Sequence, residues 1–303
     1  MEKTEFETFQ MLEGVKLVDD NISIPGYDLC RYDDWENYIM ENLNEKQLTI
    51  YGSVQKHFNK SAVILGIKVL ANDSKEATEK SRILSEKFEN VLSYIIGDLK
   101  FQYSIGTKNI RKSQFSNVVT YNEKGFGFGS KTENIHLNYN LSQQELLNEE
   151  LGYKYIWEVI GKKQTNNLQK RIIIAIEWIG KALWERDKTK TYMQLIIALE
   201  SLLQFQEKTL ISSSTANQIS EWSAFISSDD SSQRLEIYKK VKKLYEIRSA
   251  IVHSGKSSLS IENISDAFQL IKKLITQLCT DQDYLKLGSI EELNGIIAKK
   301  RFS

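Results

Sequence analysis

Two residues whose side chains could carry chemistry, Arg248 and His253, lie five positions apart in the segment KKLYEIRSAIVHSGK, residues 242–256. The ordinary pKa of histidine lies near neutrality, so an imidazole can take up or release a proton during a reaction. Arginine keeps its proton and can hold a phosphate group with two N–H donors. The chain has only three histidines, which makes this pair the first candidate for a functional site.

A helix is expected to position the pair. Residues 230–232, Asp-Ser-Ser, are good N-cap residues, and Gly255 is a natural stop because glycine adopts the left-handed conformation at low cost. Apolar residues recur between them at helical spacing, at Ile237, Val241, Leu244 and Ile251. Arg248 falls on the same face. A guanidinium there must be paired or must face a cleft or a partner chain, because an unpaired buried charge is costly.

His253 is expected on a different face of this helix. Five residues of an α-helix rotate by about 140°, which places His253 with the polar residues Lys242, Glu246 and Ser249. A joint site therefore requires a distorted helix end, an arginine side chain that wraps around the helix, or a second copy of the helix. We favour the second copy, because it also explains a charge on an apolar face.

Simpler explanations exist for the same residues. An arginine near a helix C-terminus can serve only to offset the helix dipole, and a histidine beside a glycine cap can be a surface residue. The surrounding basic residues (Lys239, Lys240, Lys242, Lys243 and Lys256) could bind RNA, or could form a solvated helix face with Glu236 and Glu246. The formal net charge of zero argues mildly against tight nonspecific RNA binding.

Length and composition set the broad class. A chain of 303 residues suggests two domains, and a hydrophobic content of 41% suffices for real cores. No apolar run approaches the roughly 18 residues of a membrane span, and the N-terminus MEKTEFETFQ does not resemble a secretory signal. The two cysteines, Cys30 and Cys279, fit a reducing cytoplasm and exclude a disulfide framework or a cysteine-rich zinc site.

Residues 1–140 are expected to form an α+β domain. The pattern predicts a helix over residues 75–96 and a turn at residues 24–26, Ile-Pro-Gly. Strand character is found at residues 48–54, 62–70, 100–105, 115–121 and 134–139.

The glycine-rich run GFGFG, residues 125–129, does not predict a phosphate-binding loop, because neither a Lys-Ser/Thr pair nor a helix follows it. A hairpin that returns through residues 122–125 is favoured. His57 and His136 have no partners at metal-ligand spacing. We therefore expect no metal site and no cofactor.

The rest of the chain reads as helical. Residues 141–168 are expected to hold a connecting helix, over residues 143–160, and a polar linker. Residues 169–303 then form an all-α bundle. Its predicted helices cover residues 171–184, 191–205, 215–226 and 260–279, the segment of Arg248, and a last helix opened by a capping box at residues 289–292.

Three segments in this half together resemble the Apea-like branch of the HEPN superfamily: RIIIAIEWIGKAL (171–183), ALESLL (198–203), which contains Glu200, and LYEIRSAIVHSG (244–255). The last contains an R-x4-H motif, which matches the R-x4-6-H signature of that superfamily. The resemblance covers roughly the second half of the chain and leaves the first half without a family.

The resemblance implies a helical bundle that dimerises through the motif helices and cleaves RNA at their interface without a metal. The 2′-OH of RNA would attack the phosphate and leave a 2′,3′-cyclic phosphate and a 5′-OH. His253 would transfer protons and Arg248 would stabilise the developing charge. Ser249 could orient the imidazole or bind phosphate. Glu200 could pair with Arg248 or a lysine, or could be a helix-flanking glutamate without a role.

Two hypotheses follow. The first is a cytoplasmic, homodimeric, metal-independent endoribonuclease that acts on tRNA or mRNA in phage defence (abortive infection) or as a toxin, and responds to a phage-derived or host trigger. The second is a noncatalytic HEPN-type module that binds RNA or a nucleotide, or only dimerises. Catalysis is assigned to Arg248 and His253, with Ser249, Glu246 and Glu200 in support. Lys242, Lys243 and Lys256 are the candidates for RNA binding. Residues 1–140 are expected to sense a signal or to position the substrate.

Overall fold

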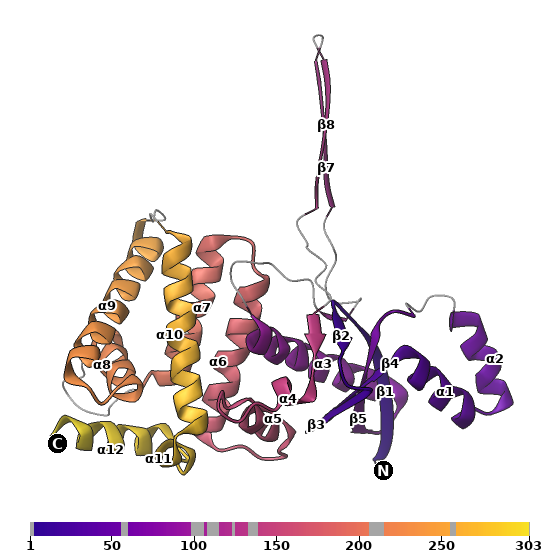
Figure 1. Ribbon diagram of the computed structural model, residues 1–303, viewed down its shortest axis with the longest axis horizontal. Helices are drawn as coiled ribbons and strands as arrows, with labels where there is room; N and C mark the ends of the chain where they lie inside the picture. Colours follow the sequence, from indigo (N-terminus) through magenta and orange to yellow (C-terminus); the bar gives the residue numbers. More distant parts are fainter. Residues whose placement is uncertain are drawn as a thin grey trace. The chain divides into compact units, whose positions relative to one another are not determined.

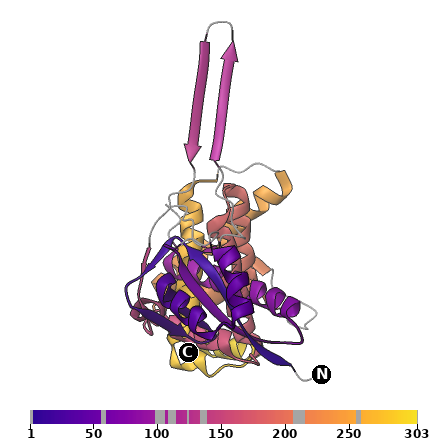
Figure 2. The same ribbon diagram turned by 90° about the vertical axis from the view of Figure 1, so that its right-hand side faces the viewer.

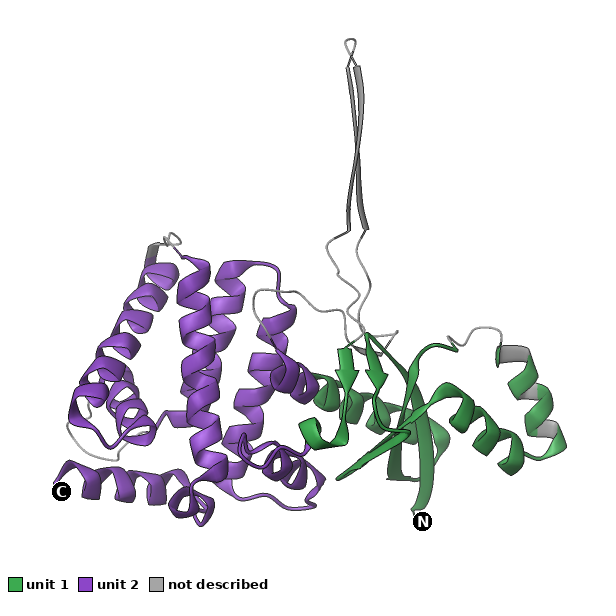
Figure 3. Cartoon of the chain, in the orientation of Figure 1, with its two compact units in different colours: residues 1–89, 100–146 green, residues 90–99, 147–303 purple. Residues whose placement is uncertain are grey.

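The computed structural model describes residues 3–55, 60–97, 106–107, 115–122, 125–132, 139–205, 215–254 and 259–302. The chain divides into two compact units, residues 1–89 with 100–146 and residues 90–99 with 147–303 (Figure 3). The first contains an antiparallel sheet with helices, and the second is helical. An α+β region followed by an all-α region is therefore confirmed.

A five-stranded antiparallel sheet forms the centre of the first unit (Figure 1). Its strand order is β3-β4-β5-β1-β6. The longest pairing joins β1 and β5 from Thr4↔Ala71 to Leu12↔Val63. The strands are β1 (Thr4–Glu13), β3 (Asn21–Ile24), β4 (Tyr27–Arg31), β5 (Val63–Ala71) and β6 (Gly106–Thr107).

Alternating side chains of β1 serve the two faces of this sheet, as the period of two in a strand requires. Thr8 and Gln10 both make hydrogen bonds with Ser81 of α3 (Ser74–Ile96). Phe9 lies on the other face, where it packs against Trp35 of α1 (Tyr32–Asn42). The sheet is thus covered by α3 on one side and by α1 on the other.

Two further strand pairs belong to this unit. Strand β2 (Val15–Leu17) pairs in parallel with β9 (Tyr139–Leu141). Strands β7 (Phe115–Asn122) and β8 (Gly125–Thr132) form an antiparallel hairpin with Asn122 opposite Gly125, and Figure 2 shows the two strands side by side. The glycine-rich run therefore lies in a hairpin strand, as predicted.

Two predictions about local structure are wrong. Residues 48–54 form no strand but the end of helix α2 (Glu45–Val54), because Asn44 and Gln47 make a reciprocal capping box that starts the helix. The single helix expected over residues 143–160 is two helices, α4 (Gln143–Leu146) and α5 (Tyr153–Gly161). Gly152, whose φ is +75°, turns the chain between them.

The other expected elements within the described residues are confirmed with small shifts of their ends. They include the helix α3, the strands β5 and β7, and the turn at Pro25 and Gly26, where Gly26 has a φ of +89°. The strand predicted at residues 100–105 lies outside the described residues, as do His57, His136 and residues 134–138.

The second unit consists of α5, the end of α3, and the helices that follow α5 in the chain (Figure 1). These helices are α6 (Asn167–Trp184), α7 (Lys188–Leu203), α8 (Thr215–Ser227), α9 (Ser231–Ser254), α10 (Ile261–Thr280), α11 (Gln282–Leu285) and α12 (Ile290–Arg301). Helix α7 contacts α6, α8, α9 and α10, and its side chains Tyr192, Leu195, Leu199 and Leu202 are fully buried. This helix is therefore central to the bundle.

The last helix begins with a variant of the predicted capping box. Ser289 accepts a hydrogen bond from the backbone of Glu292, as expected. The Glu292 carboxylate accepts a hydrogen bond from the backbone N–H of Gly288, one residue before the N-cap.

No helix in the described part of the chain has the length and apolar character needed to cross a membrane.

Candidate functional site

Helix α9 positions both motif residues. Asp230 starts it by accepting a hydrogen bond from the backbone N–H of Gln233 at 2.9 Å. Val241 and Leu244 are buried against the bundle. The buried hydroxyl of Tyr192, on α7, donates to the backbone carbonyl of Leu244 at 2.7 Å. The helix is therefore fixed to α7 one turn before Arg248.

Arg248 lies beside a carboxylate from the neighbouring helix. Its Nε is 3.9 Å from Oε1 of Glu200 on α7, and the two side chains are 36% and 22% exposed. The Nε atom itself is buried and makes no hydrogen bond within the described residues. A charge on the apolar face was expected to need a partner, and Glu200 is one at a loose ion-pair distance. Somewhat more than a third of the Arg248 side chain is accessible to solvent.

Tyr245 joins this pair and is not among the residues singled out from the sequence. It precedes Arg248 by three residues, a spacing that brings two side chains to the same side of a helix. Burial, and then the negative charge of Glu200, raise the pKa of the Tyr245 hydroxyl above its ordinary value. The hydroxyl therefore stays protonated at neutral pH and can only act as a neutral hydrogen-bonding group. The spacing of Tyr245 and Arg248 can be read from the sequence, but the burial of Tyr245 cannot.

His253 lies apart from this cluster. It is exposed in the last turn of α9, next to Val252, which is 50% exposed. The helix continues without a break through Ser254, so the rotation of about 140° between Arg248 and His253 holds. A distorted helix end is not observed. One chain alone thus presents the two side chains in different directions.

The supporting residues divide in the same way. Glu246 and Ser249 are exposed on α9, while Glu200 is half-buried beside Arg248. Among the described His, Cys, Asp and Glu side chains, no three gather closely enough to hold a metal ion.

The basic residues of α9 are partly occupied by contacts within the bundle. Lys242 donates to Oδ1 of Asn217, and Lys240 forms an ion pair with Asp266 at 2.6 Å. Lys243 is exposed, and Lys256 lies outside the described residues. The positive charge available to an RNA backbone on α9 is therefore smaller than the sequence suggests.

The arrangement as a whole offers a partly exposed arginine beside a carboxylate and a separate exposed imidazole on the same helix end. The first can bind an anion, and the second can exchange protons with solvent or with a bound molecule. Comparisons of this chain with protein-family models, with curated proteins and with solved structures find no match.

Proposed function

We propose that this protein is a metal-independent endoribonuclease of the HEPN type, with Arg248 and His253 as its catalytic residues. The observation that carries the proposal is the R-x4-H motif on the exposed end of α9, where the arginine lies beside Glu200 and the histidine is exposed. RNA supplies its own nucleophile, the 2′-OH. Cleavage then needs proton transfer and stabilisation of charge on the phosphate, which imidazole and guanidinium groups can supply.

The proposed active form is a dimer in which α9 of one chain lies against α9 of its partner. The motivation is geometric, because the two side chains diverge on one helix. Two apolar side chains at the end of α9 are not fully buried: Val252 is exposed and Ile251 is half-buried. In a two-fold dimer each site would combine Arg248 of one chain with His253 of the other, and the partner would cover these apolar residues.

The direct test is incubation of the full-length protein with total RNA in EDTA, followed by chemical mapping of the cleavage ends. We expect 2′,3′-cyclic phosphate and 5′-OH ends. His253→Ala should slow cleavage by roughly 10²–10⁴-fold, the usual contribution of acid–base catalysis, and Arg248→Ala should abolish it. Arg186→Ala removes an exposed arginine elsewhere in the helical unit and should cut at the wild-type rate. Wild-type protein that cuts only with added Mg²⁺ would refute the assignment.

Mixing the two inactive variants tests the shared site. If each site takes Arg248 from one chain and His253 from the other, an Arg248→Ala/His253→Ala heterodimer contains one intact site. Random re-pairing then restores roughly a quarter of the wild-type rate. If both residues of a site come from one chain, mixing restores nothing.

A second function, a noncatalytic module that binds RNA or a nucleotide or serves dimerisation, is favoured by one observation. Glu200 lies 3.9 Å from Arg248 and offsets part of its charge. A wild type that binds RNA in a gel-shift assay and never cuts it, under conditions where the dimer is present, would favour this function.

The biological setting belongs to the same proposal. A cytoplasmic RNase of this type would arrest growth or block phage replication by cutting tRNA or mRNA when a phage-derived or host trigger appears. The α+β unit would sense that trigger or position the RNA.

A further inference from the structure

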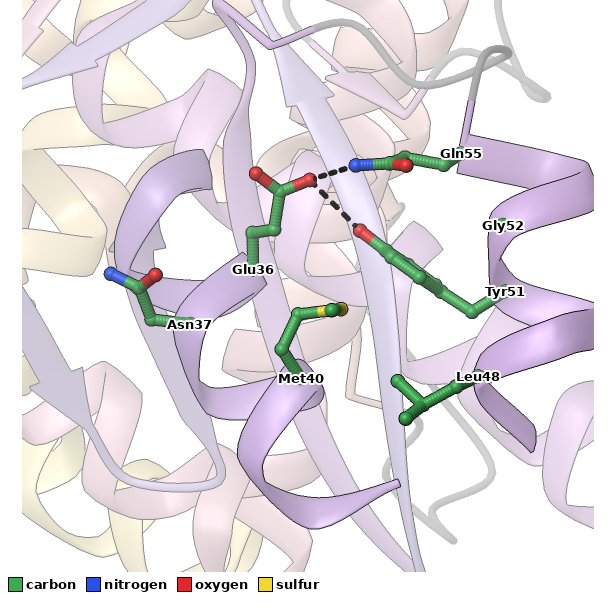
Figure 4. A pocket seen from close by; sticks show the side chains of 7 residues that line it. All are labelled: Glu36, Asn37, Met40, Leu48, Tyr51, Gly52 and Gln55. Atoms are coloured by element: carbon green, nitrogen blue, oxygen red, sulfur yellow. Dashed lines mark hydrogen bonds between the residues drawn. The ribbon is translucent and has the colours of Figure 1, made fainter. Parts of the chain in front are cut away.

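The α+β unit contains a pocket of about 330 Å³ between α1 and α2, a volume at the lower end of small-molecule sites. Figure 4 shows its lining: side chains from α1 lie on one side and side chains from α2 on the other. The lining residues are Glu36, Asn37, Met40, Leu48, Tyr51, Gly52 and Gln55.

The Glu36 carboxylate is held in place by its neighbours. Its Oε1 atom accepts hydrogen bonds from the hydroxyl of Tyr32 at 2.9 Å, from the hydroxyl of Tyr51 at 3.1 Å, and from the side-chain amide of Gln55. The hydrogen bond from Gln55, followed by that from Tyr32, lowers the pKa of Glu36. The group is therefore an ionised carboxylate with a fixed orientation.

The other oxygen of this carboxylate, Oε2, accepts no hydrogen bond from the described residues. In Figure 4 it is turned away from Tyr51 and Gln55, towards the side where the amide of Asn37 lies. Glu36 also has no ion-pair partner within 4.0 Å in the described part of the chain. The positive charge of Lys60 lowers the pKa of Glu36 without a hydrogen bond between the two. The side chains of Glu36 and Asn37, each with an oxygen acceptor, both line the pocket.

The charge of the surrounding helix has one sign. Helix α1, YDDWENYIMEN, contains the acidic residues Asp33, Asp34, Glu36 and Glu41 and no basic residue. Only Glu36 of these lines the pocket, but the negative potential of the whole helix raises the local concentration of cations near it. The remaining wall of the pocket is apolar, with Met40, Leu48 and the ring of Tyr51.

We propose that this pocket binds a small organic cation with an apolar body, an alkyl- or arylalkylammonium group in particular. The ammonium would donate to Oε2 of Glu36 and to the amide oxygen of Asn37, which suits a group with three N–H donors. The apolar body would lie over Met40 and Leu48. This site lies in the α+β unit and does not depend on the proposed RNA cleavage.

Binding of phenethylammonium to the full-length protein, measured by calorimetry or by NMR titration, tests the proposal. We expect a dissociation constant on the order of 1 mM for so small a ligand. Glu36→Gln should weaken binding about tenfold or more, since a charge-assisted hydrogen bond is lost. Glu41→Gln removes the same charge from the same helix at a residue that does not line the pocket, and should change binding less than twofold.

Two further measurements keep the result interpretable. A Cβ at Gly52 would meet no atom within 4 Å, so Gly52→Leu should fold normally, fill the pocket and weaken binding. 2-Phenylethanol, an uncharged analogue of similar shape, should bind far more weakly than phenethylammonium. Binding that Glu36→Gln leaves unchanged, or equal binding of the alcohol, would overturn the proposal.

An Nα-acetyl-lysine amide, tested in parallel, identifies the source of the ammonium group. Tighter binding of the lysine derivative would point to a lysine side chain, and tighter binding of phenethylammonium to a free amine. Failure of both to bind at about ten times the expected dissociation constant would also overturn the proposal.

Discussion

Gly180, in the middle of α6, marks a close approach between two helices of the second unit. A Cβ built at this position would lie 2.6 Å from Cα of Asn90 and 2.7 Å from its Cβ and its backbone oxygen. Ordinary contacts of a Cβ begin near 3.4 Å. Because backbone atoms are involved, a side-chain rotation cannot relieve the contact. Gly180→Ala must therefore move α6 away from the end of α3 by nearly 1 Å.

The cost follows from two opposing effects. Overpacking of a tight core costs about 1–3 kcal/mol, while alanine gains roughly 0.5–1 kcal/mol over glycine in a helix. We expect a net destabilisation of roughly 1–2 kcal/mol, which lowers the melting temperature by roughly 2–8 °C for a domain of this size. Urea denaturation followed by circular dichroism at 222 nm measures the free energy of unfolding directly.

Gly295 provides a matched control in α12 of the same unit. A Cβ there would meet no atom within 4 Å, so Gly295→Ala should raise the free energy of unfolding by about 0.5–1 kcal/mol. The two variants make the same chemical change and should move stability in opposite directions. If Gly180→Ala is as stable as Gly295→Ala, the close contact of α6 with Asn90 is not present in solution.

Three other predictions follow from the same structure. Val252→Glu places a charge on the exposed end of α9 and should convert the proposed dimer to a monomer, as measured by light scattering at tens of micromolar. Lys243→Glu, the control, should leave the dimer intact. A wild type that is already monomeric at that concentration would refute the proposed dimer. Asn166→Ala removes the capping box of α6 and should cost about 1 kcal/mol of unfolding free energy, while a loss too small to measure would show that the cap is not formed. Hydrogen bonds from Lys80 and from the backbone of Asn72 lower the pKa of Glu76 from 4.5 to about 2, so the stability that Glu76 contributes is present above pH 4.5 and is lost as the pH falls towards 2. Glu76→Gln should therefore be less stable than wild type at pH 7 and equally stable near pH 2. A stability difference that does not change with pH would contradict this explanation.

Much of the fold could be predicted because local pattern and tertiary structure agree. The helical periodicity of α3, α6 and α10 and the hairpin signal before Gly125 give the right element types. Helix α2 could not be assigned from propensity, since LTIYGSV is rich in strand-favouring residues. Its start is set instead by the Asn44–Gln47 capping box, a signal of four residues that outweighs a weak preference. Neither β1 nor α1 is among the expected elements, although Thr8 and Phe9 of β1 alternate between the two faces of the sheet.

The candidate site was predictable to a more limited extent. Helical spacing indicates that Arg248 needs a partner and that His253 faces elsewhere. The partner itself is a tertiary contact: Glu200 is distant in sequence, and its position beside Arg248 follows from the packing of α7 against α9. The burial of Tyr245 has the same origin. Residue spacing along one helix determines the direction in which each side chain points. It contains no information on which neighbouring helix lies in that direction.

The pairing of Arg248 also decides how its substitution must be interpreted. Arg248→Ala leaves the half-buried carboxylate of Glu200 beside Tyr245 without its positive neighbour, so that a loss of RNA cleavage could come from a disturbed α7–α9 contact. The cost should lie below the roughly 3–5 kcal/mol of a fully buried pair, because a third of the arginine side chain is exposed. The double variant Arg248→Met/Glu200→Gln removes both charges and keeps the side-chain volumes. If it folds as stably as wild type and fails to cut RNA, while Glu200→Gln alone still cuts, the guanidinium is needed for the reaction itself. If it cuts at the wild-type rate, Arg248 has only a structural role.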